Sequence, residues 1–470
     1  MSWCCFSLSR CRTMRPLLLL VVAIVLSSAL ADRLYAGVIV PFETITKDDR
    51  ILVLAPHPDD ETIATGGVIQ EALKVGADVR AVLFTNGENN ELSFIVYKKR
   101  PVLLGKDVLN MGEVRHNETL AAMGILGLPP EKVTDLGYPD YGTMEIATKY
   151  WGVGSKPFRS MLSRVRYVPY SDTLSPKAPY VGESILSDLK QIILDFQPTK
   201  IFVSHPADTN RDHRALYLFL KISLWDLQGV IKPPEVYPYI IHVVGWPKPR
   251  GYFPEKILDV PPDLVNSEIT WSSLTLDELE IGKKDLAVKQ YASQNKYAPK
   301  YLPTFVRRNE IFGDYPEVPL IRQMASEVAW QYVGTGDENL PVKRAGDSNR
   351  ISSLAYARQG NNLLVKLSLK HTIDQTMGIS IFLLGYRSDI PFGEMPKLNL
   401  LVGIDGFHVK DRRKNVHSKE IQFTAKDKEL TFLIPLQLLG NPEKILGSAK
   451  TLLYDLTLDE TAWRILLLGQ

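Results

Sequence analysis

Short apolar segments alternate with amphipathic stretches through the first half of the chain, and this alternation constrains the fold more than any other feature. Four segments have the composition of strands that are buried on both faces: Arg50 to Ala55, Asp78 to Thr85, Val133 to Leu136 and Lys200 to Val203. The predicted helices that alternate with them span 67–75, 114–126, 184–196 and 212–221. Such alternation indicates an α/β fold, a mostly parallel sheet with helices on both faces.

The length and the later pattern predict more than one domain. A chain of 470 residues exceeds the usual size of a single core. Residues 32–333 carry the α/β pattern, which a Pro- and Tyr-rich insertion at 142–182 interrupts; residues 236–244 are predicted to form a further strand and residues 276–293 a helix. Residues 334–349 are predicted to be a linker, and the short alternating segments of residues 350–470 indicate an all-β sandwich.

The N-terminus has the layout of a signal peptide. Basic residues precede an apolar run from Leu17 to Leu26, and the small-residue site Ala29-Leu30-Ala31 follows. We therefore expect residues 1–31 to be a signal peptide, with Met14 as the alternative start. The expected location is the periplasm, the cell envelope or the medium, and an uncleaved membrane anchor is the alternative. The apolar run is short for a membrane span, which needs roughly 20 residues.

The cysteines and the charge exclude some functions. Cys4, Cys5 and Cys11 all precede the predicted cleavage site, so the mature chain would have neither a disulfide nor a thiol nucleophile. Lys and Arg total 55 against 53 Asp and Glu, a net charge of +2 that gives no indication of a nucleic-acid partner.

The loop after the first predicted strand carries the strongest chemical signal, His57-Pro58-Asp59-Asp60-Glu61. In an open α/β sheet, ligands bind beyond the carboxyl ends of the strands. Prolines on both sides of His57 restrict the backbone there. His57 and Asp60 could bind one metal ion, while Asp59 between them stays available as a base.

A second loop, Ser204 to His213, follows the strand at residues 200–203. Because parallel strands end at the same edge of their sheet, the two loops are expected to converge. A hydrolytic zinc site commonly has three protein ligands and one open position, and His213 is the candidate third ligand.

These loops, with Arg115-x-x-Glu118 and Pro139-Asp140 between them, resemble the PIG-L/LmbE de-N-acetylases over roughly residues 47–312. The resemblance implies a Rossmann-like fold, with His57, Asp60 and His213 as ligands of Zn²⁺ and Asp59 as the general base. Two nitrogens and one carboxylate also suit Fe²⁺.

The implied function is a zinc-dependent N-deacetylase, a hydrolase of linear amide C–N bonds. It would remove the acetyl group from an N-acetylated amino sugar or glycoconjugate by attack of zinc-bound water. Two alternatives stay open: hydrolysis of another N-acyl or ester group, and a non-catalytic exported glycan-binding protein.

The second loop departs from the family pattern at one position. Many relatives read His-Pro-Asp-His there, whereas this chain has Asn210-Arg211-Asp212-His213. Asn210 could donate a hydrogen bond to the oxyanion, but it cannot protonate a leaving amine. His205, His242 or protonated Asp59 would have to do so.

Several of these residues have a structural alternative. Asp212 either orients an imidazole or caps a helix. His205 could support the site from behind or simply end its strand, and His242 could be an ordinary strand histidine. The resemblance implies that Arg115 and Asp140 bind sugar hydroxyls or a phosphate, with a solvated helix charge as the alternative for Arg115.

The C-terminal domain is expected to be either a glycan-binding appendage or purely structural. Trp463 could stack on a sugar, although a single tryptophan in a strand more often packs in a core. The acylated substrate and the oligomeric state stay open at this level.

Overall fold

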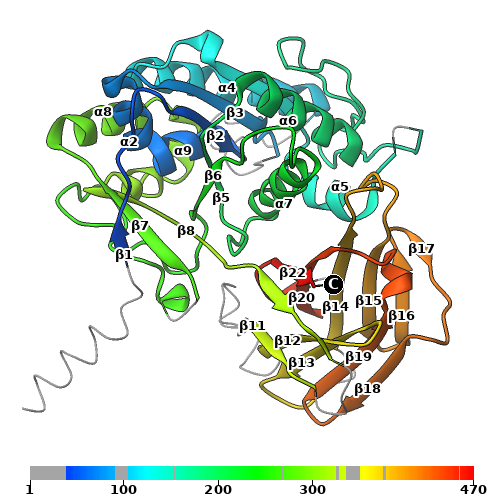
Figure 1. Cartoon of the computed structure of the whole chain (residues 1–470). Coiled ribbons are helices and arrows are strands. Elements are labelled where there is room, and N and C mark those ends of the chain that lie inside the picture. Colours follow the sequence, from blue (N-terminus) through cyan, green and yellow to red (C-terminus); the bar gives the residue numbers. More distant parts are fainter. Residues whose placement is uncertain are drawn as a thin grey trace, which may run out of the picture.

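The computed structural model describes residues 39–89, 104–152, 154–265, 268–323, 328–334, 350–373, 377–454 and 456–469. The predicted signal peptide, with Met14, lies outside the described residues, as does the predicted linker except for Gly334. No helix in the described ranges is both long enough and apolar enough to span a membrane. Figure 1 shows two lobes, an α/β lobe above and a lobe of strands below.

The α/β lobe is built on a five-stranded parallel sheet with the order β4-β3-β2-β5-β6. Its strands are β2 (Arg50–Ala55), β3 (Asp78–Thr85), β4 (Val133–Tyr138), β5 (Lys200–Ser204) and β6 (Glu235–Tyr239). After β2, the chain forms β3 and then β4 on one side of β2. It then crosses over and forms β5 and β6 on the other side of β2. The carboxyl ends of β2 and β5 therefore form the switch point at which such sheets bind ligands.

Helices cover both faces of this sheet (Figure 1). Ile51 and Val53 of β2 pack into one core, whereas Leu52 and Leu54 pack into the other, as the two-residue period of a strand requires. The first core contains side chains of α2 (Asp60–Val75), α4 (Gly105–Leu126) and α8 (Glu278–Val288), and α9 (Ala292–Tyr297) follows α8. The second contains those of α5 (Thr143–Lys149), α6 (Gly182–Phe196) and α7 (Arg211–Asp226).

A small additional sheet was not predicted. It has the order β1-β7-β8, with β1 (Ile39–Pro41), β7 (Thr270–Thr275) and β8 (Asn309–Asp314). Its first strand is exposed at all three residues and pairs with a strand that begins at Thr270, more than 200 positions away. Local periodicity contains no signal for such a pairing.

Several predicted boundaries differ from the structure. The helix predicted at 114–126 begins at Gly105, and the one predicted at 212–221 ends at Asp226. The helix predicted at 67–75 begins at Asp60. Its first turn contains acidic residues, whose negative charge interacts favourably with the positive end of the helix dipole. The predicted 276–293 helix is two helices, α8 and α9. The strand predicted at 236–244 ends at Tyr239, because the backbone N–H groups of Ile241 and His242 donate to the Asp208 carboxylate instead of a neighbouring strand.

The lower lobe consists of two mainly antiparallel sheets that enclose a third apolar core. One has the order β10-β12-β13-β19-β18, with β11 also paired to β12, and the other β17-β16-β15-β14-β20-β22-β9, with β21 paired to β20. The strands are β9 (Val318–Leu320), β10 (Arg322–Gln323), β11 (Gln331–Gly334), β12 (Ile351–Gln359), β13 (Asn362–Leu369), β14 (Met377–Tyr386), β15 (Lys397–Gly403), β16 (Gly406–Asp411), β17 (Lys414–Asn415), β18 (Gln422–Lys426), β19 (Glu429–Pro435), β20 (Lys444–Leu453), β21 (Leu456–Glu460) and β22 (Arg464–Leu468).

The strand pairing places the beginning of this lobe earlier than the predicted boundary at 333. β9 pairs with β22, and β10 and β11 pair with β12, so residues 318–320, 322–323 and 331–334 belong to the lower sheets. These strands are short, and β9 pairs with a segment far along the chain, which local patterning does not reveal.

The two lobes are packed against each other at the start of α7. Arg214 is buried, and its guanidinium donates to the backbone carbonyl of Thr461 and pairs with Glu460 at 3.3 Å. The backbone N–H of Trp463 donates to the carbonyl of Pro206. The lower lobe therefore touches the same loop and helix that carry Asp212 and His213.

Candidate active site

The turn from β2 into α2 holds Asp59 in a strained conformation. Its φ is +118°, which is rare for a residue with a side chain. Two contacts hold the turn in place: the N–H of Asp59 donates to Glu61, and the hydroxyl of Tyr291 donates to the same carboxylate group. Strain of this kind is retained where surrounding contacts dictate it, which is common at functional sites.

His57, Asp60 and His213 converge at the carboxyl ends of β2 and β5. His57 Nδ1 lies 3.3 Å from Asp60 Oδ2 and 3.3 Å from His213 Nε2, and His213 Nε2 lies 3.1 Å from Asp60 Oδ2. All three residues are buried. A zinc ion bound tetrahedrally at its usual ligand distances would separate its ligand atoms by about 3.3 Å. The three atoms therefore fit one metal ion.

Carboxylates hold the other nitrogen of each of these histidines. Asp208 Oδ2 lies 3.2 Å from His213 Nδ1, and Asp140 Oδ1 and Asp212 Oδ2 lie 3.2 and 3.5 Å from His57 Nε2. Metal-binding histidines usually have such a partner, which fixes the tautomer and the ring orientation. Asp208 was not identified from the sequence, although it lies in the second loop, five positions before His213.

The electrostatics of the cluster also fit a cation. Burial disfavours a charged His213, but Asp208 and Asp60 outweigh it and raise the pKa of His213 to about 9. Burial likewise opposes a charged His57, yet the neighbouring aspartates raise its pKa well above the usual value. Despite burial, His213 and His57 hold the pKa of Asp60 below its usual value. These carboxylates thus stabilise positive charge where a metal would lie.

Asp59 differs from Asp60 in its surroundings. Burial raises the pKa of Asp59 well above its ordinary value, and Arg115 acts against that rise. A guanidinium nitrogen of Arg115 lies 3.2 Å from Asp59 Oδ2. A carboxylate with a raised pKa can act as a base closer to neutral pH.

Arg115 and Asp140 both have contacts within the protein, beside the substrate contact that the resemblance implies. Arg115 is buried, and it donates to the carbonyls of Gly87 and Pro58 as well as to Asp59. It therefore positions the Asp59 loop and is not a solvated helix charge. Asp140 is also buried and faces His57, with its other oxygen accepting the N–H of Asn89. Both residues still line the cavity described below.

His205 and His242, two candidates for the proton donor to the leaving amine, lie in different surroundings. His205 is fully buried, stacks on Trp271 at 5.6 Å and does not line the cavity. Burial lowers the pKa of His205 to about 3. His205, one of the three candidates for this proton, therefore lies behind the site with a neutral ring. His242 does line the cavity, and its Nδ1 lies 3.1 Å from Asp208 Oδ1.

Asn210 and Asp212 both have structural contacts at the start of α7. Asn210 is the N-cap, because its side-chain oxygen accepts the N–H of Asp212. Its amide nitrogen is then the group that it can offer to the cavity, which it lines. Asp212 accepts the N–H groups of Tyr141 and Thr143 and contacts His57 rather than its neighbour His213. Asp212 Oδ2 lies 3.5 Å from Nε2 of His57, a position from which it could orient that imidazole.

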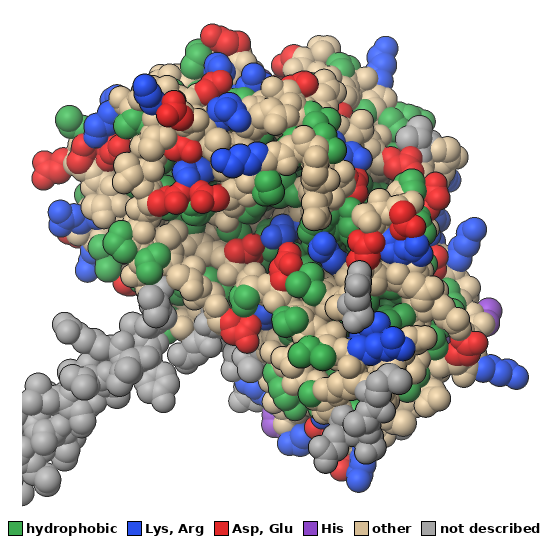
Figure 2. Space-filling model, viewed as in Figure 1, with side chains coloured by type: hydrophobic (Ala, Val, Ile, Leu, Met, Phe, Trp, Pro, Cys, Tyr) green, Lys and Arg blue, Asp and Glu red, His purple; other side chains and the backbone are tan. Residues whose placement is uncertain are grey.

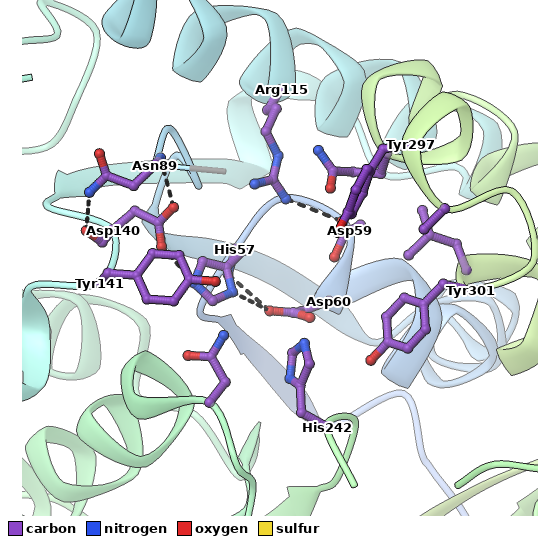
Figure 3. Close-up of a pocket in the computed structure, with 14 residues that line it drawn as sticks. His57, Asp59, Asp60, Asn89, Arg115, Asp140, Tyr141, His242, Tyr297 and Tyr301 are labelled. Carbon is purple, nitrogen blue, oxygen red and sulfur yellow. Dashed lines mark hydrogen bonds and ion pairs between the residues drawn. The ribbon is translucent and has the colours of Figure 1, made fainter. Parts of the chain in front are cut away.

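A cavity of about 450 Å³ opens over this cluster, a size suited to a small-molecule ligand. Figure 3 shows His57, Asp60 and His242 directed toward its centre, with Tyr141, Tyr297 and Tyr301 around them. The sequence analysis did not identify these three tyrosines, nor four other lining residues, Asn89, Gln294, Ala298 and Leu302. The residues from 294 onward follow α8, and nothing in their local sequence marks them as part of a site.

Comparisons with known proteins agree with this geometry. Residues 52–222 match the family model "PIG-L: GlcNAc-PI de-N-acetylase". Two similar curated proteins are both 1D-myo-inositol 2-acetamido-2-deoxy-alpha-D-glucopyranoside deacetylases. The one from Corynebacterium glutamicum (strain R) is 35% identical over 79 residues, 17% of this chain and 26% of that protein. The one from Mycobacterium sp. (strain KMS) is 38% identical over 79 residues, 17% of this chain and 25% of that protein.

The matched part is only about a quarter of each curated relative. Among solved structures, the N,N'-diacetylchitobiose deacetylase from Pyrococcus horikoshii aligns at 19% identity with a TM-score of 0.32, over 56% of this chain and 82% of that chain. A likeness at that level gives no information on the substrate. The matching family model, together with the loops at the ends of β2 and β5, identifies residues 52–222 as a domain of the PIG-L family.

Proposed function

We propose that the chain is a metal-dependent hydrolase that removes the acetyl group from an N-acetylated amino sugar. The observation that carries the proposal is the convergence of His57, Asp60 and His213 within 3.3 Å of one another, with Asp59 beside them. The two curated relatives described above are deacetylases of an acetamido sugar, which supports the same class of substrate.

The residues that would hold the metal are His57, Asp60 and His213. Zn²⁺ is the ion best suited to this set, and Fe²⁺ is the alternative. When bound, such an ion lowers the pKa of water and polarises a carbonyl oxygen. This donor set leaves a coordination position open toward the cavity, as a catalytic rather than a structural site requires.

Asp59 is proposed as the general base. Its carboxylate lines the cavity beside the cluster, and Arg115 fixes its orientation at 3.2 Å. Because Asp59 is buried and its pKa is raised, the protonated form that follows proton uptake would be retained within the site. Asp59 could then also return the proton.

His242 is proposed as the proton donor to the leaving amine. Asp208 holds Nδ1 of His242 at 3.1 Å, which leaves Nε2 as the nitrogen available to the cavity. An imidazole held by a carboxylate in this way is suited to general acid catalysis. The amide nitrogen of Asn210 would donate to the oxyanion that develops on the acetyl oxygen.

Acetate release from a panel of N-acetylated sugars, measured on the metal-loaded full chain, tests this function. The panel comprises N-acetylglucosamine, N,N'-diacetylchitobiose and N-acetylglucosaminyl inositol, with an N-propionyl sugar and an acetyl ester for the alternative hydrolase functions. We expect acetate from at least one N-acetyl sugar, and loss of that activity in Asp59→Asn with the metal content unchanged. A metal-free chain that binds sugars without turnover would instead indicate the glycan-binding alternative.

Export is part of the proposal, supported by the basic and apolar pattern of residues 10–31. N-terminal sequencing of protein collected from the periplasm or the medium tests it. We expect a mature chain that begins at Asp32, and a retained Met1 or Met14 would contradict the cleavage.

A further inference from the structure

A second cavity, of about 280 Å³, lies between the two lobes. The upper lobe contributes residues of α5 and the first residue of α7, whereas the lower lobe contributes residues of β14, β15, β20 and β21 together with Trp463. Figure 1 shows α5 and α7 facing the upper ends of these strands, and Figure 2 shows basic and acidic side chains along the seam. We refer to this space as the interlobe cavity.

We propose that the interlobe cavity binds an anionic group, a carboxylate or a phosphate, carried by the glycan whose N-acetyl sugar occupies the active site. This inference rests on the proposed function, because it concerns an acidic class of the same substrate.

Two cations of the interlobe cavity have no carboxylate partner. Glu145 is paired with Lys149 at 2.7 Å, and Glu460 is paired with Arg214 at 3.3 Å. Arg211 and Lys450 are left, and neither forms an ion pair or a side-chain hydrogen bond with any of the described residues. The lining thus has three cations, Lys149, Arg211 and Lys450, against the two carboxylates of Glu145 and Glu460, and both carboxylates are already paired.

Lys450 is the more informative of the two cations, because only 9% of its surface is exposed. Lysine is rarely buried to this extent without a partner. Its ammonium nitrogen lies 5.4 Å from the centre of the Phe382 ring, which is a weak interaction for a buried charge. Burial and the nearby Arg211 lower the pKa of Lys450, and Glu460 and Glu145 offset only part of that decrease. A bound anion would counteract it further.

The start of α7 adds to the positive potential. Arg211 is the first residue of this 16-residue helix, where the dipole already favours an anion over a cation. Asp212 is the acidic residue of the same turn, but its carboxylate contacts His57, Tyr141 and Thr143 and does not line the interlobe cavity. The planar guanidinium of Arg211 can bind a carboxylate or a phosphate through two parallel hydrogen bonds.

Other lining groups suit a sugar that carries the anionic group. The indole N–H of Trp463 is buried with no partner in the described structure, and Phe382 packs beside that ring at 6.0 Å. The side-chain oxygen of Asn399 accepts the Ser380 hydroxyl, which leaves its amide nitrogen as a donor. Tyr454 is 80% exposed, so the cavity reaches the surface there.

The interlobe cavity and the active site are separated by two short stretches of chain. Asn210 lines the active site and Arg211 lines the interlobe cavity, and the Cα atoms of consecutive residues are about 3.8 Å apart. Tyr141 lines the active site, and Met144, three positions later in the chain, lines the interlobe cavity. The two cavities are thus near each other, and the inference places the N-acetyl sugar of one oligosaccharide in the first and its anionic group in the second, which would give the lower lobe a role in binding.

Calorimetric titration of the full chain with two tetrasaccharides tests this inference. One alternates glucuronate with N-acetylglucosamine, and the other is neutral chitotetraose. We expect the acidic tetrasaccharide to bind at least about tenfold more tightly, with a preference that weakens as salt is added. A parallel titration with inorganic phosphate tests whether a free anion is bound, and competition by phosphate against the acidic tetrasaccharide is expected.

The variants Lys450→Met and Arg211→Gln should each remove most of the preference for the acidic tetrasaccharide. The matched control is Lys426→Gln, an exposed lysine on β18 in the same lobe with the same loss of charge, which should retain it. Lys450→Arg keeps the charge and should also retain it, which separates charge from misfolding. Equal binding of the two tetrasaccharides, or a preference unchanged in both cavity variants, would overturn the inference.

Binding is measured without turnover, so the result does not depend on deacetylation. Asp59→Asn provides the distinction: it should lose acetate release and keep the preference for the acidic tetrasaccharide. A chain that shows this preference but releases no acetate would contradict the proposed function alone.

Discussion

The carboxylate of Asp208 lies 3.2 Å from Nδ1 of His213, on the ring atom opposite to the one that faces His57 and Asp60. The other oxygen of the same carboxylate lies 3.1 Å from Nδ1 of His242. One fully buried aspartate thus orients a proposed metal ligand and the proposed proton donor. Despite its burial, these two histidines hold the pKa of Asp208 well below the usual range.

Asp208→Asn is expected to weaken metal binding about 10- to 100-fold, because a neutral amide supports the imidazole less well than a carboxylate. Competition with a chromogenic chelator measures the metal affinity. Asp107→Asn, at the start of α4 and away from the cluster, serves as the control. Unchanged affinity in Asp208→Asn would show that the carboxylate does not support a metal ligand.

His242→Gln is expected to lower kcat for acetate release by about 10²- to 10⁴-fold, the usual contribution of a general acid. His205→Gln is the matched comparison, because this histidine is buried outside the cavity. It should lower thermal stability and leave kcat nearly unchanged. An unchanged kcat in His242→Gln would leave Asp59 as the carrier of the proton.

Arg115→Met is expected to move the acidic limb of the pH–rate profile to higher pH. The guanidinium favours ionised Asp59, so its removal raises the pKa of Asp59 further. Since the base acts when it is deprotonated, activity appears only as the pH rises through that pKa, and the variant requires a higher pH. Measurement of kcat/KM between pH 5 and 9 checks the shift, and a shift to lower pH would contradict the role given to Arg115.

The buried ion pair between Lys284 and Glu310 is expected to stabilise the helices behind the site. Its atoms lie 2.6 Å apart, and Glu310 also accepts the N–H groups of Gly67 and Val68 in α2. Glu310→Gln leaves the lysine charge buried without a partner, which costs about 3 to 5 kcal/mol in the free energy of unfolding. Urea unfolding monitored by circular dichroism measures this.

The exposed pair between Lys289 and Asp285 on the same helix is the control for that measurement. Lys289→Met should change the free energy of unfolding by about 0 to 1 kcal/mol, because solvent screens a surface pair. Equal losses in the two variants would contradict the importance of burial.

The fold class and the central strands followed from local patterns. A strand buried on both faces needs a continuous apolar run, and a helix needs an apolar stripe, so β2, β3 and α6 were recognisable from their own residues. The pairing of β1 with β7, and of β9 with β22, joins segments that are distant in the chain. The pairing of such strands depends on which sheet edges are still unpaired when the other elements have folded. The sequence of a short segment does not contain this information.

The candidate site divides in the same way. The residues that touch the proposed metal lie in two short loops whose composition and position after strands indicated them: His57, Asp60 and His213. The residues that support and surround them were assigned differently or missed. Arg115 was expected to face the substrate or solvent, and it also contacts Asp59; of the two candidate histidines His205 and His242, it is His242 that lines the cavity.

By itself, the sequence determined the α/β pattern, the two chemically distinctive loops and the residue types that suit a metal and a base. A residue's own chemistry and its position after a strand are local properties, so they can be read along the chain. Tertiary structure alone decided which carboxylate holds which histidine, which histidine faces the cavity and where the lower lobe meets α7. Those relations depend on distances between segments far apart in the chain, and packing sets these distances only once both lobes are folded.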